Sequence, residues 1–327
     1  MKNILITGAA GYIGSHICEL LIKKKKKIIC IDNLSTGFKE LLLPGSIFIK
    51  ADIRNSKKIL KILKEYNIDS VIHLAAKLNI DESQKRKKEY FSNNVYATLQ
   101  LINLCNEAKV KNFLFSSTCA VYGNHSKGYV YENDKKKPTS YYGKTKLLAE
   151  NLINNKFKGN KFILRYFNVV GSSKSGKIGQ ISDNGQLFKN LSKEILKEKP
   201  SINVFGNNYE NKDGTCIRDY IHVSDLAKIH IKVLSKMNSK NISGVLNCGY
   251  GKGYSVLEII KAFENVSKKK IRIKLCKKRD GDISKIICKS KTIKKIINLK
   301  FDYKELRDII KTSIQWEKKL KKIKKFL

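Results

Sequence analysis

Two side chains near the middle of the sequence, Tyr142 and Lys146, have types and a spacing that suit proton transfer. Residues four apart lie on one face of a helix, so a helix here would bring the phenol and the ammonium together. An ammonium beside a phenol favours the phenolate and lowers the pKa of the tyrosine, which could then act as a base near neutral pH. The neighbouring Tyr141 has Thr145 at the same distance and is predicted to be a packing residue. A solvated helix face is the alternative interpretation of this spacing.

A glycine-rich turn near the start of the chain predicts a dinucleotide-binding site. Three glycines have the spacing GxxGxxG: Gly8, Gly11 and Gly14. An apolar run at 2–7 precedes them and an amphipathic stretch follows, which predicts a strand, a turn and a helix. Glycines allow the backbone to approach a pyrophosphate, and the helix N-terminus binds it through unpaired N–H groups.

An acidic residue, Asp32, ends the second apolar run at 28–31. A carboxylate at this position can accept hydrogen bonds from both ribose hydroxyls of adenosine, and it would repel a 2′-phosphate. The sequence therefore favours NAD over NADP as the cofactor. A turn residue before Asn33 is the alternative role of Asp32.

Strand and helix patterns alternate along the first half of the chain. Strands are expected at 46–50, 69–73, 111–116 and 161–165, and helices at 56–66, 84–108 and 141–154. The alternation predicts an α/β fold with a Rossmann-like, doubly wound parallel sheet, whose ligands bind beyond the carboxyl ends of the strands. We expect an NAD-binding domain at 1–165 and a second, smaller, mixed α/β domain at 166–327. Parts of 219–248 could rejoin the first domain, and the terminal helix at 304–327 is expected to pack against the protein.

The composition predicts a globular, cytoplasmic protein. The chain of 327 residues is 42% hydrophobic, begins without the pattern of a signal peptide, and has no apolar run near the roughly 18 residues of a membrane span. Its eight cysteines show no metal-ligand spacing, so reduced thiols and no bound metal are expected.

The net charge of +39 would suit a nucleic acid or a membrane surface as a partner. Lysine is spread through nearly every segment, however, which indicates a compositional bias rather than a basic patch, so we expect neither partner. Only seven of the 67 basic residues are arginines, which suggests that arginine stands where a planar, bidentate fork is needed. Four of them fall inside motifs: Arg54, Arg165, Arg218 and Arg279.

With these features assembled, the chain resembles the extended short-chain dehydrogenase/reductases over nearly its whole length, and among them most closely the UDP-glucose 4-epimerase family. The motifs that carry the resemblance are the glycine turn, Asp32-Asn33-Leu34, Asp52-Ile53-Arg54, Ser116-Ser117-Thr118, the Tyr142 and Lys146 pair, and the stretches 165–168, 213–223 and 279–282. The resemblance implies an enzyme that interconverts UDP-glucose and UDP-galactose at C4 through a transient 4-keto intermediate, with tightly bound NAD. It also implies a homodimer.

The resemblance assigns roles to individual residues. The implied cofactor site consists of Gly8, Gly11, Tyr12, Ile13, Gly14, Asp32, Asn33, Asp52, Ile53, Leu74, Ala75, Ala76, Asn94, Ser116, Tyr142 and Lys146. The implied substrate site consists of Thr118, Tyr142, Asn168, Gln186, Leu187, Phe205, Arg218, Arg279 and Asp282. Tyr142 would take the O4 proton, Thr118 would share in the transfer, and Lys146 would bind the nicotinamide ribose and lower the tyrosine pKa. Arg218 and Arg279 would bind the diphosphate; Asp282 would bind the uridine ribose and Phe205 would border the uracil.

Several alternatives remain open at this point. Related dehydratases and decarboxylases place an acid directly after the Ser/Thr, where this chain has Cys119, so elimination would lack its general acid. A non-catalytic NAD-binding sensor would typically lose the tyrosine or the lysine. Ile286 aligns where residue size controls access of N-acetylated sugars, which leaves epimerisation of UDP-GlcNAc and UDP-GalNAc open. Gln186 replaces a usual Asn or His, and Arg218 could instead pair with Asp219.

Overall fold

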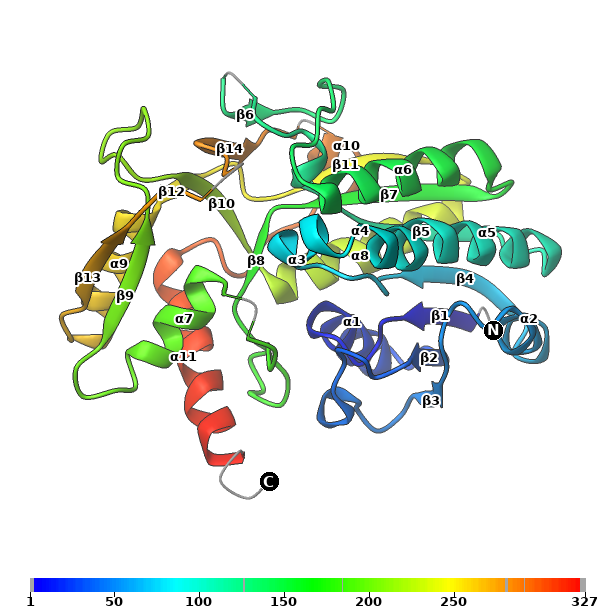
Figure 1. The fold of residues 1–327 in the computed structure, drawn as a ribbon. Coiled ribbons are helices and arrows are strands. Elements are labelled where there is room, and N and C mark those ends of the chain that lie inside the picture. The colour runs from blue at the N-terminus through cyan, green and yellow to red at the C-terminus, as the bar shows by residue number, and fades with distance from the viewer. Residues whose placement is uncertain (1–2, 126, 184, 280–281, 291, 324–327) are drawn as a thin grey trace.

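The computed structural model describes residues 3–125, 127–183, 185–279, 282–290 and 292–323 (Figure 1). Three parts of the sequence expectations fall partly outside these ranges. They are position 2 of the first apolar run, positions 280–281 of the 279–282 motif, and positions 324–327 of the terminal helix.

The largest element is a parallel sheet of seven strands, which confirms the doubly wound α/β fold. Its strands are β1 (Asn3–Thr7), β2 (Ile28–Asp32), β3 (Ile47–Lys50), β4 (Ile68–His73), β5 (Asn112–Thr118), β7 (Asn160–Tyr166) and β11 (Gly244–Cys248). They are ordered β11-β7-β5-β4-β1-β2-β3, and every neighbouring pair is parallel. The strand order reverses between β1 and β4, which is where sheets of this kind bind their ligands.

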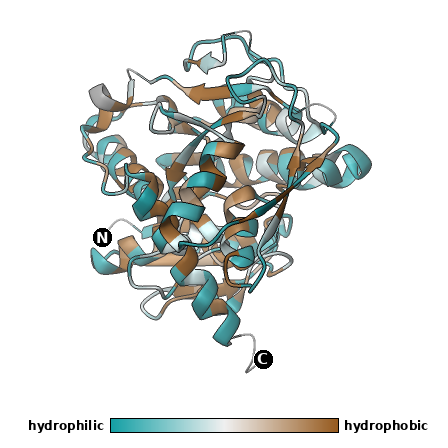
Figure 2. Ribbon diagram, turned by 90° about the vertical axis from the view of Figure 1, so that its left-hand side faces the viewer, coloured by the Kyte–Doolittle hydropathy of each residue, from teal (hydrophilic) through white to brown (hydrophobic). Residues whose placement is uncertain are grey.

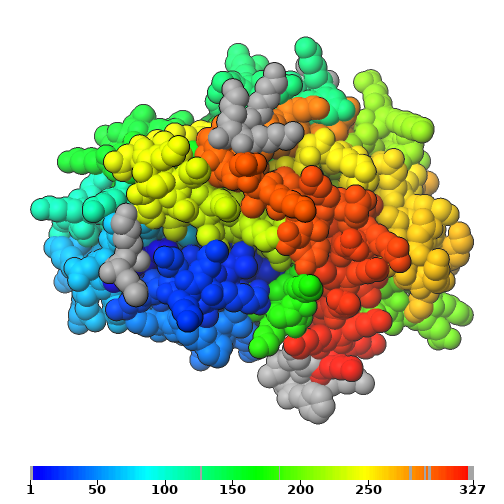
Figure 3. Space-filling view, turned by 180° about the vertical axis from the view of Figure 1, so that it is seen from behind, coloured from blue at the N-terminus to red at the C-terminus, as the bar shows by residue number. Residues whose placement is uncertain are grey.

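Helices cover both faces of this sheet and bury its apolar side chains. One face packs on α1 (Tyr12–Lys23), α8 (Val223–Lys240) and α10 (Thr292–Ile297), and the other on α2 (Ser56–Glu65), α5 (Ala97–Glu107) and α6 (Tyr141–Lys156). Hydrophobic residues gather on the strands and on the inward faces of the helices (Figure 2). From behind, the surface of α8 lies beside that of the N-terminal segment (Figure 3).

The prediction of a single helix at 84–108 is wrong in one respect: the segment is divided into several helical pieces. It comprises α3 (Ile80–Lys85), α4 (Lys87–Phe91), a π-helical segment η2 (Ser92–Tyr96) and then α5. Arg86, at φ −112° and ψ 46°, leaves the helical region and separates α3 from α4. No glycine or proline marks either change, so the sequence pattern gave no signal for them.

The remaining elements form a second layered unit beside the large sheet (Figure 1). Its strands are β6 (Tyr129–Val130), β8 (Asn168–Val170), β10 (Ile217–His222), β12 (Gly253–Ser255) and β14 (Lys285–Cys288) in one sheet, and β9 (Ser201–Phe205) and β13 (Arg272–Cys276) in another. Helices α7 (Leu187–Glu194), α9 (Val256–Ser267) and α11 (Leu306–Ile323) pack together around a buried core with Phe188, Phe263 and Ile310. β11 and α8 lie with the large sheet, although both fall within 166–327. We therefore propose two domains in which β11 and α8 belong to the first.

Over the described ranges, no helix is both long enough and apolar enough to cross a bilayer.

Candidate active site

Helix α6 carries Tyr142 and Lys146 on its buried face. The Ser140 hydroxyl caps this helix by accepting a hydrogen bond from the Gly143 N–H at 3.1 Å, so the helix begins at Tyr141, the first of the two adjacent tyrosines. A Cβ at Gly143 would lie 2.8 Å from the Ala120 carbonyl oxygen, so glycine lets α6 approach the end of β5 closely. Tyr142 is 9% exposed and Lys146 2% exposed. The predicted pair is therefore a buried pair and not a solvated helix face.

The partners of the pair come from the carboxyl end of β5. The Tyr142 phenol lies beside the Thr118 side chain, whose hydroxyl accepts a bond from the Ala120 N–H at 3.1 Å. The Lys146 ammonium donates to the Ser116 carbonyl at 2.8 Å and lies 4.7 Å from the ring centroid of Phe115. The three predicted catalytic residues are thus brought together at one strand end.

The electrostatics of the pair differ from the sequence expectation. Burial raises the pKa of Tyr142 above its usual value, and the neighbouring Thr118 hydroxyl opposes this only in part. Burial also lowers the pKa of Lys146 to about 7, against the opposing charge of Glu150. Desolvation disfavours both charged forms, and the lysine is directed at a carbonyl, so the chain by itself does not produce the lowered tyrosine pKa that was expected.

The glycine turn joins β1 to α1 and packs closely against neighbouring backbone. Gly8 has φ +71°, and a Cβ there would lie 2.8 Å from the Ala75 nitrogen. A Cβ at Gly14 would overlap the Gly8 carbonyl oxygen. Gly11 precedes α1 without a side-chain cap, so the first N–H groups of the helix, from Tyr12 and Ile13 onward, are available to an anion.

Replacing Gly14 by alanine is expected to lower both the NAD content of the purified protein and its melting temperature, because the added Cβ overlaps backbone. Gly244→Ala on β11, outside the predicted cofactor site, is the matched control. Its Cβ would lie 3.1 Å from a ring carbon of Phe162, which a small shift can relieve. Cofactor released by denaturation and quantified by absorbance, together with a thermal melt, measures both effects. Equal behaviour of the two variants would show that the close approach at Gly14 does not matter.

Asp32 is held at the end of β2 by backbone donors. Its carboxylate accepts bonds from the Ala10 N–H at 3.1 Å and from the Leu34 N–H at 2.8 Å. Burial raises the pKa of Asp32, and these two donors oppose the rise. Gly37 packs directly on the carboxylate, since a Cβ there would lie 2.8 Å from Oδ1. The bond from Leu34 is the turn contact that was the alternative role of Asp32. The bond from Ala10 places the same carboxylate beside the glycine turn.

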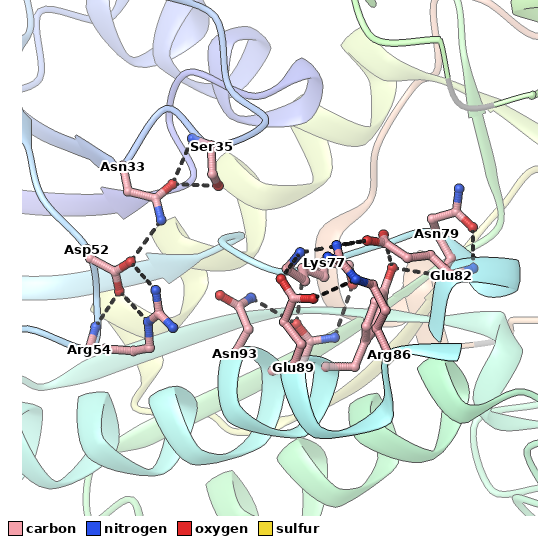
Figure 4. A network of polar contacts seen from close by, with 12 residues as sticks. Asn33, Ser35, Asp52, Arg54, Lys77, Asn79, Glu82, Arg86, Glu89 and Asn93 are labelled. Carbon is pink, nitrogen blue, oxygen red and sulfur yellow. Dashed lines mark hydrogen bonds and ion pairs between the residues drawn. The ribbon is translucent and has the colours of Figure 1, made fainter. Parts of the chain in front are cut away.

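A second acidic position, Asp52, lies near Asn33 at the adjacent strand end. Its carboxylate accepts from the Asn33 amide at 2.9 Å and from the Arg54 guanidinium at 2.9 and 2.7 Å (Figure 4). The Arg54 fork holds the pKa of Asp52 well below its usual range. Asp52 and Ile53 were both predicted to contact the cofactor. The side chain of Ile53 is buried in the core, so it is not available for such a contact.

The loop after β4 is tied to β1 by Thr7, a residue that the sequence reasoning missed. The Thr7 hydroxyl accepts from the N–H groups of Leu74 and Ala75, both at 3.2 Å, and is bonded to His73 Nδ1 at 2.7 Å. Ala76 continues the same loop, half-buried. These bonds fix the predicted cofactor residues 74–76 next to the glycine turn.

Asn94 joins this loop to α6 from the π-helical segment. Its side-chain amide donates to the Lys77 carbonyl at 3.0 Å and to the Thr145 hydroxyl at 3.2 Å, and its oxygen accepts from the Lys77 N–H at 2.9 Å. Asn94 is 2% exposed. Its bonding capacity is largely used within the protein, so Asn94 holds this loop against α6.

A network of charged residues, which sequence reasoning missed, surrounds the junction of α3 and α4 (Figure 4). Lys77 pairs with Glu89 at 2.6 Å, and Arg86 pairs with Glu82 at 3.0 Å and with Glu89 at 3.2 Å. The buried Ser83 of α3 accepts a hydrogen bond from the Tyr142 N–H at 3.1 Å. The divided helix therefore contacts the N-terminus of α6 directly.

On the other side of the site, Arg218 on β10 forms an ion pair with Asp282 at 2.6 Å. The Tyr209 hydroxyl donates to the second oxygen of Asp282 at 3.1 Å. The alternative pairing of Arg218 with Asp219 is wrong, because successive residues of a strand point to opposite faces. Asp219 accepts bonds from backbone N–H groups, including that of Gly251 at 2.8 Å.

The other predicted substrate residues lie at the ends of neighbouring elements. The Arg279 guanidinium lies 4.0 Å from the ring centroid of Phe205, at the end of β9. Asn168 begins β8 and is exposed, Gln186 is the exposed residue before α7, and Leu187 is half-buried. Arg218 opposes the rise in the pKa of the Cys119 thiol, so the arginine lies near the carboxyl end of β5.

Comparison with known proteins agrees with this geometry. Residues 4–249 match the NAD dependent epimerase/dehydratase family. A UDP-glucose 4-epimerase of Lactobacillus helveticus is 35% identical over 320 residues, which cover 97% of each chain. One of Azospirillum brasilense is 32% identical over 97% of this chain and 92% of its own length.

Solved structures give the same result. The UDP-glucose 4-epimerase of Stenotrophomonas maltophila, with bound NAD and formylated UDP-arabinopyranose, superposes with a TM-score of 0.94 at 31% identity, over 99% of this chain and 100% of its own. That of Bifidobacterium longum, in complex with NAD+ and UDP, gives 0.90 at 31% identity, over 97% and 98%. The chain belongs to the NAD dependent epimerase/dehydratase family. The resemblance to UDP-glucose 4-epimerases drawn from the motifs is confirmed over the full length.

The described residues fit a dinucleotide on structural grounds. The turn needs glycine at positions 8 and 14, because a Cβ there would overlap neighbouring backbone, and the uncapped N-terminus of α1 suits a pyrophosphate. Asp32 at the end of β2 suits a ribose.

Proposed function

We propose that the protein interconverts UDP-glucose and UDP-galactose at C4 through a transient 4-keto sugar, with tightly bound NAD. The observation that carries the proposal is the contact between Tyr142 and Thr118 at the end of β5, with Lys146 one helical turn further on. This group lies between the glycine turn and the Arg218–Asp282 pair, so a dinucleotide and a nucleotide sugar could meet there.

The chemistry explains why both ligands are required. The hydrogen on C4 of a hexose is not acidic, because no neighbouring carbonyl stabilises a carbanion, so direct deprotonation cannot invert this carbon. When bound, NAD supplies a hydride acceptor and a cationic ring whose charge favours the phenolate form of a nearby tyrosine. Tyr142 takes the O4 proton and later returns it, and Thr118 orients O4 and shares in the transfer.

Residues of the second unit are proposed to hold the UDP. Arg218 and Arg279 carry forks suited to paired bonds with a diphosphate. Asp282, which fixes Arg218 in the structure, is proposed to bind the uridine ribose, and Phe205 to border the uracil. Three further residues are proposed to contact the sugar or nucleotide: Asn168, Gln186 and Leu187.

Two competing activities are less well supported. Elimination needs a general acid after Thr118, but burial raises the pKa of Cys119 to about 12, and such a thiol is a poor proton donor at neutral pH. Epimerisation of N-acetylated sugars depends on the space around Ile286. Ile286 is 2% exposed and packs with Phe167 and Val121, so its neighbours fill the space around it.

Incubation of the purified protein with UDP-galactose, UDP-glucose and UDP-GlcNAc, followed by chromatography of the sugars, tests the proposal. Interconversion of the two hexoses is expected. Failure to convert either hexose would refute it, and conversion of UDP-GlcNAc alone would move the assignment to the alternative substrate. NADP among the released nucleotides would contradict the role proposed for Asp32.

A homodimer is proposed as the working form. Three large apolar side chains, Phe91, Tyr96 and Leu148, are 44%, 52% and 44% exposed. They lie on α4, η2 and α6, which pack against one another, and Phe91, Tyr96 and Tyr141 line a hollow of about 340 Å³ there. An exposed apolar patch of this kind suits a second copy of the chain related by two-fold symmetry.

The double substitution Phe91→Glu and Tyr96→Glu is therefore expected to produce a monomer, because it places charges in the proposed interface. Leu275→Glu on β13 is the matched control, since Leu275 is 61% exposed away from this face. Size-exclusion chromatography with light scattering measures the mass. A dimer that survives the double substitution would place the interface elsewhere.

We also propose that the protein works in the cytoplasm. All eight cysteines are free thiols in the structure, which suits a reducing compartment. Recovery of the native protein in a secreted or membrane fraction after cell fractionation would contradict this.

A further inference from the structure

A chain of buried hydrogen bonds runs through His73, the last residue of β4. Its Nδ1 is bonded to the Thr7 hydroxyl at 2.7 Å, and its Nε2 to the Thr98 hydroxyl of α5 at 3.0 Å. The three side chains are at most 1% exposed, so they are out of contact with bulk water. Each of their hydrogen atoms therefore needs an acceptor within the protein.

The donors and acceptors along the chain determine which nitrogen of His73 carries its hydrogen. The Thr98 hydroxyl donates its one hydrogen to the Asn94 carbonyl at 2.8 Å, so it can only accept from His73. Nε2 must then be the nitrogen that carries hydrogen. In a neutral imidazole Nδ1 is consequently an acceptor, and it takes the hydrogen of the Thr7 hydroxyl.

The other tautomer would leave a buried group without a partner. The Thr7 hydroxyl oxygen accepts from the N–H groups of Leu74 and Ala75, both at 3.2 Å, and these occupy its two lone pairs. A hydrogen on Nδ1 of His73 would bring a third donor to this oxygen and leave the Thr7 hydrogen without an acceptor. An imidazolium carries the same hydrogen and meets the same conflict. An unpaired buried donor is costly, so the bonding favours the neutral Nε2–H form.

We propose that His73, neutral and with its hydrogen on Nε2, is a positioning residue for the loop at 74–77. The inference rests on the function proposed above, in which residues 74–76 contact the cofactor. His73 touches neither substrate nor cofactor in this account. It acts by directing the Thr7 hydrogen towards Nδ1, which leaves the Thr7 oxygen free to accept from the loop.

The same chain connects the two ends of the loop. Thr7 holds the start, and the Asn94 side chain holds the end through the N–H and the carbonyl of Lys77. The Asn94 carbonyl also accepts from Thr98, the partner of His73. His73 therefore links the strand that holds one end of the loop to the helical segments that hold the other.

A purely structural role is the competing explanation, in which His73 only fills the space beside the rings of Phe113 and Phe115, at 5.9 and 5.7 Å. The tautomer would then be unspecified. Loss of the Thr7 hydroxyl would lower the melting temperature without loosening the cofactor.

The tautomer can be measured by 15N NMR of the NAD-containing protein labelled in its histidines. At pH 7, His73 is expected to show a bare nitrogen at Nδ1 and a hydrogen-bearing nitrogen at Nε2. Loss of its signals in His73→Gln assigns them, and single substitutions of the other four histidines assign them by exclusion if that variant does not fold. Hydrogen on Nδ1, a mixture of tautomers or an imidazolium would overturn the proposal.

Thr7→Val is expected to raise the rate of NAD release about tenfold, because the hydroxyl that accepts two loop N–H groups is lost. Thr7→Ser keeps the hydroxyl and is expected to release NAD at close to the wild-type rate. Transfer of NAD to an excess of an alcohol dehydrogenase with ethanol, followed by the absorbance of NADH, measures this rate.

Thr312→Val is the matched control, because the Thr312 hydroxyl bonds another buried histidine, His222, at 3.1 Å in the second unit. It is expected to lower the melting temperature and leave NAD release unchanged. An unchanged rate in Thr7→Val, or an equal rise in Thr312→Val, would overturn the proposal. The NMR measurement uses the unaltered protein, so it remains decisive if Thr7→Val does not fold. Neither measurement requires conversion of a UDP-sugar, so this failure is distinguishable from failure of the proposed function.

Discussion

Tyr142→Phe is expected to lower kcat by at least about 10²-fold and to leave the NAD content unchanged, since a positioned general base contributes this much or more. The substitution removes only the hydroxyl that lies beside Thr118, while the buried ring still fills its place. Conversion of UDP-galactose to UDP-glucose, measured beside the absorbance of released cofactor, gives both quantities.

Tyr141→Phe provides the control for this result. Tyr141 is the adjacent residue of the same helix, has Thr145 instead of lysine four residues on, and is half-buried. It is expected to keep near-normal turnover. Near-normal turnover in Tyr142→Phe, or an equal loss in both variants, would remove Tyr142 from the catalytic role.

Lys146→Met is expected to lower kcat by about 10²-fold, because the buried amine one helical turn from Tyr142, which is proposed to bind the nicotinamide ribose, is lost. It is also expected to change how stability depends on pH. The pKa of Lys146 is lowered from 10.5 to about 7 in the folded chain. Between these two values the unfolded chain holds a proton that the folded chain lacks, so Lys146 makes stability rise as pH rises through this window.

Urea unfolding at pH 6.5 and 9.5 tests this sign. The stability of wild type relative to Lys146→Met is expected to increase by about 1 kcal/mol or more between the two pH values, because one pKa unit corresponds to about 1.36 kcal/mol. Matched NAD content in both proteins removes differences in cofactor binding. A constant or decreasing difference would show that Lys146 is not desolvated as described.

Local patterns predicted the parts of the fold and the site that depend on neighbours in sequence. Glycine spacing, apolar runs and the four-residue spacing of Tyr142 and Lys146 each describe one turn, strand or helix, and each was found in the structure. The scarcity of arginine was also informative. Arg54 and Arg165 each bind a carboxylate through two nitrogen atoms, which is the bidentate contact expected of arginine in a chain that otherwise uses lysine.

Contacts between distant segments could not be predicted in this way. Arg218 and Asp282 are 64 residues apart, so only the folded chain shows that two residues assigned to different parts of a nucleotide bind each other. The bond from Tyr142 to Ser83 depends on a helix break at Arg86 that no glycine or proline announces. The raised pKa of Tyr142 depends on burial, which a helix-face argument does not include.

The most direct test of the central claim follows the C4 hydrogen during turnover in D2O. Transient oxidation moves this hydrogen within the closed site and returns it to the same carbon, so the product is expected to carry no solvent deuterium at C4. Mass spectrometry and proton NMR of UDP-glucose formed from UDP-galactose measure this. Retention of the original hydrogen at C4 would agree with its removal as hydride and its return to the same carbon, while Tyr142 exchanges only the O4 proton. Deuterium at C4 after a single conversion would show that the carbon is inverted by proton exchange, and would contradict the account.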